Sequence, residues 1–339
     1  MKRLRTALLG CGTFAHRHAQ NLTSLESDID LVAFCDCNEE KAQAYSQQYC
    51  RGEANIYTDH HDLLDREELD LLVVTLPPYG HSDEVELAAQ RGVHLLMEKP
   101  IALTSEHAWR MVAAVEAAGI KTQAGFMFRF GEAVEQLKVY LQSGEAGRPG
   151  LMSARYFCNS LHAPWWRSRE KSGGQLVEQV IHMVDLMRYL LGEPTSVYSR
   201  QENLFHQSMP DYTIEDVSVS VFGFQSGAMG VIYATNGAIP NRWINDYRFV
   251  AERLTAEFTN ANSATFHFTA GQAAEPQVIA GQRNVHLCEL QDLIHAIHEG
   301  GETRTPLREG ARSLDAALAA RRSAEMHCEL NLLAGDASR

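Results

Sequence analysis

A glycine-rich turn near the start of the chain constrains the fold more than any other feature. The apolar segment 5–9 has the composition of a short buried strand, and it is followed directly by Gly10-Cys11-Gly12-Thr13-Phe14-Ala15. This run fits the G-x-G-x-x-G/A pattern: the first glycine makes a tight turn, the second lets a pyrophosphate approach the backbone, and the last small residue packs helix on strand. We therefore predict a dinucleotide-binding turn, with a helix beginning near Phe14 that directs free N–H groups at the phosphates.

Asp36 supports the same prediction. It directly follows a second apolar run, 31–35. Its distance along the chain from the glycine motif is close to the roughly 20 residues expected for a carboxylate that binds the ribose hydroxyls. A carboxylate at this place repels a 2′-phosphate, and its neighbours Cys37 and Asn38 offer no guanidinium to neutralise one. The sequence therefore predicts NAD(H) as cofactor rather than NADP(H).

The apolar patterns predict two architectures along the chain. Up to residue 125, strand-like and helical runs alternate, as a parallel sheet with crossover helices requires. The expected strands there include 69–75, 93–97 and 120–125, and the expected helices include 84–90 and 105–118. Later strands, such as 217–224 and 229–234, are longer and alternate with polar residues, which is typical of antiparallel sheets.

We therefore expect an α/β protein of two domains. Residues 1–125 form an N-terminal, doubly wound Rossmann domain with a parallel sheet, which binds NAD. Residues 126–339 form a C-terminal α+β domain with an open, mostly antiparallel sheet, which binds the substrate. The last residues, 334–339, are expected to fray.

Composition limits the partners and the location. A formal charge of −13 disfavours nucleic acid and anionic membranes as partners. No apolar run approaches the length of a membrane span, and the chain passes from Met1 into a strand within a few residues, so we expect a soluble, unexported protein. The seven cysteines are odd in number, scattered and without C-x-x-C pairs, which argues against a disulfide framework or a zinc ribbon. These features favour the cytoplasm.

Lys99 stands where an expected strand meets the ligand-binding edge of the parallel sheet. The strand 93–97 delivers it within the tripeptide Glu98-Lys99-Pro100. Open α/β sheets bind ligands at the carboxyl edge of their strands, and a lysine held there can be tuned for proton transfer. The tripeptide alone is equally compatible with an ordinary turn closed by a proline, so the assignment depends on the rest of the chain.

A polar cluster marks the second domain. A helix is expected to open at 172–175 and to close at Gly192, and within it Glu178, His182 and Asp185 fall at i, i+4 and i+7, on one face. The plain alternative is a solvated helix face, but the flanking residues are mostly apolar. The spacing is not that of H-E-x-x-H zinc enzymes, so no metal is expected. A histidine beside a carboxylate is suited to moving a proton.

Together these motifs resemble the Gfo/Idh/MocA oxidoreductases, a family named after glucose-fructose oxidoreductase and inositol dehydrogenase. The resemblance is nearly end to end and is carried by Gly10-Cys11-Gly12 with His18, Pro77 with His81, Gly92, Glu98-Lys99-Pro100, Arg129, and Gly173-Gly174 through Glu178, His182 and Asp185. It implies a Rossmann domain, a second domain whose open sheet often forms the subunit interface of a homo-oligomer (dimer or tetramer), and hydride transfer between nicotinamide and a secondary hydroxyl of a sugar or cyclitol.

The resemblance also implies site residues. The family's E-K-P lysine corresponds to Lys99, and its D-x-x-x-H pair corresponds to Glu178 and His182. We expect His182 to act as base, Lys99 to hydrogen-bond the reacting oxygen, and Glu178 to orient His182 or bind a neighbouring hydroxyl. Further expected residues are, for the cofactor, Thr75, Pro77, His81 and Glu98, and, for the substrate, Arg129, Trp166 and Trp243. A place in the core is equally open for Trp166, and a surface salt bridge is equally open for Arg129.

Two departures from the family pattern affect the expected pocket. Glu178 replaces the usual aspartate, and Val180 replaces a glycine that usually follows two residues later. Pro78 also replaces a frequent asparagine. These changes suit a subfamily with a differently shaped pocket, and they remove no proton-transferring group.

Three classes of function stay open. The first is an NAD-dependent dehydrogenase or ketoreductase acting on a carbohydrate or polyol, and the acidic chain favours a neutral substrate. The second retains the cofactor and oxidises a sugar transiently, so that elimination, epimerisation or glycoside cleavage can follow. The third is a non-catalytic NAD-binding regulator, and the presence of Lys99, Glu178 and His182 argues against it.

Overall fold

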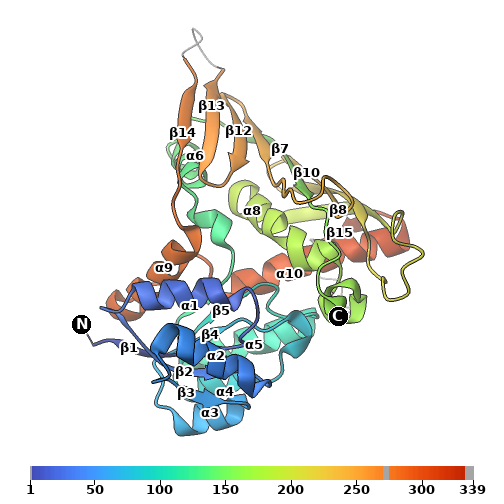
Figure 1. Ribbon diagram of the computed structural model, residues 1–339. Coiled ribbons are helices and arrows are strands. Elements are labelled where there is room, and N and C mark those ends of the chain that lie inside the picture. The colour runs from blue at the N-terminus through green and yellow to red at the C-terminus, as the bar shows by residue number, and fades with distance from the viewer. Residues whose placement is uncertain (1, 270–274, 333–339) are drawn as a thin grey trace. The chain divides into compact units, whose positions relative to one another are not determined.

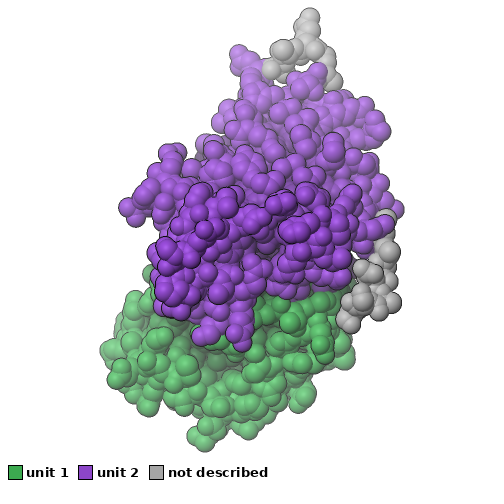
Figure 2. Space-filling view, turned by 90° about the vertical axis from the view of Figure 1, so that its right-hand side faces the viewer, with its two compact units in different colours: residues 1–126, 286–311 green, residues 127–285, 312–339 purple. Residues whose placement is uncertain are grey.

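The chain divides into two compact units. The structure is a computed structural model that describes residues 2–269 and 275–332, so the tail 334–339, expected to fray, lies outside the described residues. Unit 1 consists of residues Met1–Phe126 and His286–Ala311, and unit 2 of residues Met127–Val285 and Arg312–Arg339 (Figure 2). Within the described residues, no helix is long and apolar enough to cross a membrane.

Unit 1 contains a six-stranded parallel sheet in the order β3-β2-β1-β4-β5-β6 (Figure 1). The strands are β1 (Leu4–Leu9), β2 (Ile29–Cys35), β3 (Asn55–Tyr57), β4 (Leu71–Val74), β5 (His94–Met97) and β6 (Thr122–Ala124). The helices are α1 (Ala15–Ser24), α2 (Glu39–Cys50), α3 (His60–Arg66), α4 (Glu84–Gln90), α5 (Ser105–Ala118) and α9 (Val285–Glu299), with a short 3₁₀ turn η1 (Pro78–Gly80). This is the strand order of a Rossmann fold, whose ligands bind where the order reverses beside β1.

Local sequence explains much of unit 1. Strands β4 and β5 are largely buried because helices cover both faces of a parallel sheet. Thr104 caps α5 by accepting a hydrogen bond from the His107 N–H, and Gly119 ends that helix in the left-handed conformation. The expected helices 84–90 and 105–118 are confirmed as α4 and α5.

The segment His286–Ala311 belongs to unit 1, which differs from the single boundary expected at residue 125. Helix α9 buries Leu290 and Leu293 in the hydrophobic core of the Rossmann sheet. The Thr305 hydroxyl then donates to the Ala124 carbonyl at the end of β6. This return of the chain to unit 1 was not predicted, because the pattern of an amphipathic helix does not specify which sheet the helix covers.

Unit 2 contains a nine-stranded sheet in the order β14-β13-β12-β11-β7-β10-β9-β8-β15. Its strands are β7 (Pro149–Phe157), β8 (Pro194–Glu202), β9 (Val217–Phe224), β10 (Met229–Thr235), β11 (Tyr247–Ala251), β12 (Leu254–Asn260), β13 (Ser263–Phe268), β14 (Gln277–Ala280) and β15 (Leu330–Asn331). Strands β7 and β10 pair in parallel and the other neighbours pair antiparallel, which confirms the expected mostly antiparallel sheet.

The helices of unit 2 supply one side of its core. They are α6 (Glu132–Gln142), α7 (Arg169–Ser172), α8 (Ile181–Leu191) and α10 (Leu307–Met326), with 3₁₀ turns η2 (Met127–Phe130) and η3 (Pro164–Arg167) and a π turn η4 (Leu176–Val180). Residues of α6, α8 and α10 pack with alternate side chains of the strands in one hydrophobic cluster. The other side chains of β8, β9 and β10 include exposed apolar residues such as Tyr198, Val221 and Tyr233.

Candidate functional site

The glycine turn has the geometry that a pyrophosphate needs. Gly10 has φ of +92°, and a Cβ there would lie 2.8 Å from the Thr75 carbonyl oxygen, so this position requires glycine. The Thr75 hydroxyl donates to the Gly10 carbonyl at 2.6 Å and so fixes the turn. A Cβ on Gly12, by contrast, would meet no atom within 4 Å. The open space beside Gly12 is where a phosphate group can approach the backbone.

The residues that follow also fit a dinucleotide. Ala15 begins α1 and is fully buried, whereas Thr13 and Phe14 are exposed before the first turn of that helix. The two carboxylate oxygens of Asp36 accept hydrogen bonds at 2.8 Å from the N–H groups of Cys11 and Asn38. The carboxylate is therefore fixed at the end of β2 and keeps acceptor capacity for ribose hydroxyls.

His81 does not have the position expected of a cofactor ligand. Pro77 and η1 lead from β4 to His81, whose Nδ1–H donates to Glu84 Oε1 at 2.6 Å, with 1% and 0% of the two side chains exposed. Burial alone would raise the pKa of Glu84, but the hydrogen bond and charge of His81 lower it to about 2. His81 is therefore a buried partner of Glu84, because its ring is shielded from any bound molecule.

Lys99 follows β5 directly, as expected, and is half-buried. Glu98, expected to bind the cofactor, is 8% exposed and binds protein groups instead. His18 Nε2 on α1 donates to Glu98 Oε1 at 2.7 Å, and the Lys99 N–H donates to Glu98 Oε2 at 3.2 Å. Glu98 therefore binds neighbouring groups of the protein itself, and a direct contact between its carboxylate and the cofactor stays a prediction.

In unit 2, Glu178 lies on the π turn η4 immediately before α8. The helix opens at the end of the expected segment 172–175, because Gly173 and Gly174 have φ of 81° and 101° and separate it from the short helix α7. The helix restarts where Glu215 Oε1 accepts a hydrogen bond from the Leu176 N–H at 2.7 Å. π turns occur frequently at functional sites, and this one carries the predicted acid.

Trp166 is a buried partner of Glu178. Its indole Nε1–H donates to Glu178 Oε2 at 2.7 Å, and the side chain is 2% exposed. It packs with Tyr212 and Ile214 in a small core of its own. Trp166 therefore does not offer a face to a sugar, as expected of a substrate-binding residue, but it holds the carboxylate of Glu178 in one orientation.

His182 lies on α8 with its ring centroid 5.1 Å from that of Phe128. Asp185, expected on the same face, forms a buried, bidentate ion pair with Arg129 (Nε–Oδ2 2.8 Å, Nη2–Oδ1 2.6 Å). The hydroxyl of Ser313 on α10 also donates to Asp185 at 2.9 Å. Arg129 therefore anchors η2 to α8, which favours the salt-bridge alternative over a role toward the substrate, although the ion pair is buried and not on the surface.

His162, which was not predicted, forms an aromatic group with Trp166 and Trp243. The ring of His162 lies 4.3 Å from that of Trp166 and 5.5 Å from that of Trp243, centroid to centroid. Trp243 is 51% exposed, as expected for a loop residue that can contact a substrate. His162 Nε2 accepts a hydrogen bond from Gln179 at 3.0 Å. No local signal identifies His162, because its role depends on two loops far apart in the chain.

His60 and His61 lie together with Asp59 in a group whose ligand atoms are within 4.8 Å of one another. The Nε2 atoms of the two histidines lie 2.8 and 3.3 Å from Asp83 Oδ1. The hydrogen bond from His60 lowers the pKa of Asp83. These ion pairs connect the starts of α3 and α4 and account for the cluster without an ion.

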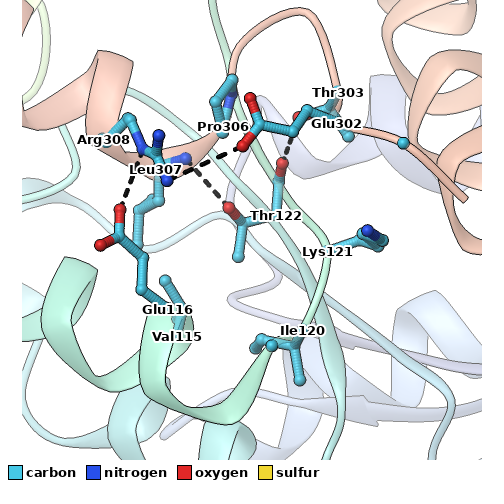
Figure 3. A pocket seen from close by; sticks show the side chains of 12 residues that line it. Val115, Glu116, Ile120, Lys121, Thr122, Glu302, Thr303, Pro306, Leu307 and Arg308 are labelled. Atoms are coloured by element: carbon cyan, nitrogen blue, oxygen red, sulfur yellow. Dashed lines mark hydrogen bonds and ion pairs between the residues drawn. The ribbon is translucent and has the colours of Figure 1, made fainter.

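A separate pocket lies between the end of α5 and the loop before α10, within unit 1 (Figure 3). Arg308 binds Glu116 at 2.9 Å, and the Thr303 hydroxyl donates to the Thr122 carbonyl at 2.5 Å. The twelve residues that line this pocket include none of the predicted site residues. It is therefore distinct from the candidate site.

The Rossmann sheet, the glycine turn and Asp36 define a dinucleotide-binding protein. Comparison with known families agrees: residues 4–126 match the oxidoreductase family with an NAD-binding Rossmann fold, and residues 134–271 match the GFO/IDH/MocA C-terminal domain. The chain belongs to the GFO/IDH/MocA family, which confirms the resemblance inferred from its motifs.

Similar proteins include inositol 2-dehydrogenase of Salmonella paratyphi B, 30% identical over 191 residues, which are 56% of this chain and 55% of that protein. The match to this relative therefore spans about half of its length. The scyllo-inositol 2-dehydrogenase (NAD(+)) of Bacillus subtilis is 30% identical over 233 residues, 68% of this chain and 67% of that protein. Levoglucosan dehydrogenase, solved in complex with NADH and L-sorbose, shares the fold with a TM-score of 0.90, 20% identity, and coverage of 98% of this chain and 99% of that chain.

Proposed function

We propose that this chain is an NAD(H)-dependent dehydrogenase or reductase that acts on a secondary hydroxyl or ketone of a sugar, polyol or cyclitol. The observation that carries the proposal is the place of Lys99, which follows β5 at the carboxyl edge of a sheet of the NAD-binding type. In an open α/β sheet this edge is where ligands bind. The names of the two inositol dehydrogenases support the substrate class.

The proposed chemistry divides between a few side chains. NAD, when bound, accepts or supplies the hydride. His182 takes the proton of the substrate hydroxyl, since an imidazole exchanges protons near neutral pH. Lys99 hydrogen-bonds the reacting oxygen and stabilises its developing negative charge. Glu178, held by the Trp166 indole, orients His182 or binds a neighbouring hydroxyl.

We also propose a preference for NAD(H) over NADP(H). The Asp36 carboxylate is fixed by two backbone N–H groups, so it cannot easily turn away from a 2′-phosphate. The variant Asp36→Ser should shift the ratio of kcat/KM for NAD⁺ to that for NADP⁺ toward NADP⁺ by at least about tenfold, the value of one charge-assisted hydrogen bond. An unchanged ratio would remove Asp36 from this role.

The first experiment follows absorbance at 340 nm and the bound nucleotide content of the purified protein, with NAD⁺ and a panel of sugars, polyols and glycosides. Stoichiometric reduction of free NAD⁺ supports the dehydrogenase and identifies its substrate class. Product formation with copurified nucleotide and no net NADH favours transient oxidation by a retained cofactor. Nucleotide binding without reaction across the panel favours a regulator and contradicts the proposal.

We further propose that the chain forms a homo-oligomer through the open face of the sheet in unit 2. Tyr233 pairs with Val219, and Val221 pairs with Tyr198, so these exposed apolar side chains share one face. A contiguous apolar surface of this kind marks an interface. Sedimentation velocity should show a dimer or tetramer for the wild type and a smaller species for Val221→Lys; a monomeric wild type contradicts the proposal.

A cytoplasmic location also stays a proposal, supported by the cysteines. All seven are free thiols. Burial, the largest cause, raises the pKa of Cys35 to about 12, so this thiol stays protonated and unreactive. Such thiols are compatible with a reducing compartment. Fractionation of the native host would test the location.

A further inference from the structure

A buried histidine–glutamate pair connects the cofactor helix to the turn that carries Lys99. His18 is one turn along α1, the helix whose start is expected at the pyrophosphate, and it is 2% exposed. Its Nε2–H donates to Glu98 Oε1 at 2.7 Å, across 80 residues of sequence. A charge-assisted hydrogen bond shielded from water is among the stronger contacts in a protein. The start of α1 and the end of β5 are therefore held in one arrangement.

The second carboxylate oxygen of Glu98 fixes the backbone of Lys99 itself. Glu98 Oε2 accepts a hydrogen bond from the Lys99 N–H at 3.2 Å. Gly125, at the end of the neighbouring strand, makes room for this arrangement, because a Cβ there would lie 2.9 Å from Glu98 Oε2. His18 thus holds one oxygen of the carboxylate, and the Lys99 N–H holds the other.

Charges near the pair keep Glu98 ionised. Burial alone would raise the pKa of Glu98, but the hydrogen bond and charge of His18, followed by the charge of Lys99, lower it. The ring of Phe14, exposed in the glycine turn, lies 5.7 Å from both His18 and His286. The pair therefore lies directly beneath the turn expected to bind the dinucleotide.

We propose that His18 and Glu98 are positioning residues for Lys99. They hold the turn that carries the lysine and connect it to α1, so that Lys99 keeps a fixed place relative to the cofactor helix. The inference rests on the proposed function, because it assigns the reacting oxygen to Lys99. If the buried pair only stabilised the fold, its removal would lower kcat by the same factor whether or not Lys99 is present. A positioning role predicts a loss of kcat that depends on Lys99, so the two roles can be distinguished by measurement.

The test uses the full chain and a matched control. Glu98→Gln removes the charge, His18→Leu removes the donor, and His18→Gln keeps a donor. The control is Glu67→Gln. Glu67 belongs to the same unit, is only 9% exposed, and accepts hydrogen bonds from Asn55 and Tyr57. It precedes β4 in the chain and therefore lies away from the carboxyl end of that strand, where the candidate residues are. Each change is made in the wild type and in Lys99→Met.

We expect kcat to fall about 10–100-fold in Glu98→Gln and His18→Leu, the range that corresponds to one lost hydrogen bond to a charged group. His18→Gln should recover part of the loss, and the NAD⁺ dissociation constant should change by less than about threefold. In the Lys99→Met background the same changes should have little further effect, because the residue through which they act is absent. The inference is overturned if Glu98→Gln and His18→Leu keep the wild-type kcat. It is also overturned if these variants lower kcat by the same factor in the wild type and in Lys99→Met, or if Glu67→Gln lowers kcat as much as they do.

A second readout needs no turnover. The rate at which the Lys99 amine is reductively methylated is measured by mass spectrometry, with the exposed Lys2 as internal reference. The methylation rate of Lys99 should change about threefold or more in Glu98→Gln, a change on the order of that expected from one lost hydrogen bond. The rate should stay constant in Glu67→Gln. An unchanged rate overturns the inference. If the wild type turns over no substrate but the Lys99 rate responds, the proposed function fails while the positioning role holds.

Discussion

In unit 1 the candidate residues come from the ends of neighbouring strands, whereas in unit 2 they come from one helix and the loops that return to it. Gly10, Thr75 and Lys99 follow β1, β4 and β5, which lie side by side and parallel. In unit 2, Glu178 lies on a π turn, and its partner Trp166 lies in a 3₁₀ turn outside any strand. In unit 1 the candidate residues lie close together because parallel strands end at the same edge of the sheet. In unit 2 their positions depend on individual side-chain contacts.

The two units also differ in the kinds of charged side chain that they bury. Unit 1 buries two pairs of histidine and glutamate, His18–Glu98 and His81–Glu84. Unit 2 buries the pair Arg129–Asp185, whose guanidinium carries a fixed charge, and holds a partly buried pair, His206–Asp216. Unit 2 should therefore be sensitive to the loss of Arg129.

The largest expected effect tests whether both units contribute to the chemistry. Lys99→Met in unit 1 and His182→Gln in unit 2 should each lower kcat by roughly 10²–10⁴-fold, the usual contribution of a general acid or base. The NAD⁺ dissociation constant, from a fluorescence titration, should stay nearly constant. Lys121→Met and His267→Gln serve as controls outside the candidate site. If either site variant keeps the wild-type kcat, the unit that carries it does not supply the proposed group.

What the sequence could predict follows the same contrast. Helices α4 and α5 and the place of Lys99 were predicted correctly, because caps, glycines and apolar runs act locally. For Trp166 and Arg129 the sequence left two roles open, and the structure favours a place in the core and an ion pair over a contact with the substrate. Their positions depend on contacts across 12 and 56 residues, with Glu178 and Asp185, and no periodicity reports such contacts. Long-range pairing of side chains is the part of the site that a single sequence does not determine.

Removal of Arg129 should expose the dependence of unit 2 on one ion pair. Arg129→Met leaves the Asp185 carboxylate buried without its guanidinium, which should lower the free energy of unfolding by about 3–5 kcal/mol. Arg155→Met is the matched control, because the Arg155–Asp246 pair is more exposed and should be worth about 1 kcal/mol or less. Urea titrations measure both. Equal losses would mean that burial does not distinguish the two pairs.

His286 should make unit 1 sensitive to acid. Burial, the largest cause, lowers its pKa from 6.5 to about 4, with Glu98 acting against the shift and Arg17 and His18 adding to it. The folded state thus holds a neutral imidazole, while the unfolded chain takes up a proton below pH 6.5. Stability is complete above pH 6.5 and falls toward pH 4, by about 2 kcal/mol at pH 5.

The variant His286→Gln has no such proton to take up. The loss of unfolding free energy between pH 7 and pH 5, from urea titrations at the two values, should therefore be smaller in this variant by about the same 2 kcal/mol. A wild type and a variant that lose stability in parallel would show that other groups cause the acid sensitivity of unit 1.

The smallest effect is expected for a change at Trp166. This change tests whether Trp166 affects catalysis through Glu178 or only fills the core of unit 2. Trp166→Phe keeps an aromatic ring but removes the N–H that donates to Glu178 Oε2 at 2.7 Å. The loss of one hydrogen bond to a carboxylate should lower kcat/KM for the substrate about tenfold or somewhat more and leave NAD⁺ binding unchanged. In the background of Glu178→Gln the same change should cost much less, because the charged acceptor is gone. If the loss is the same in both backgrounds, Trp166 acts through packing, and the arrangement of loops in unit 2 is structural at this position.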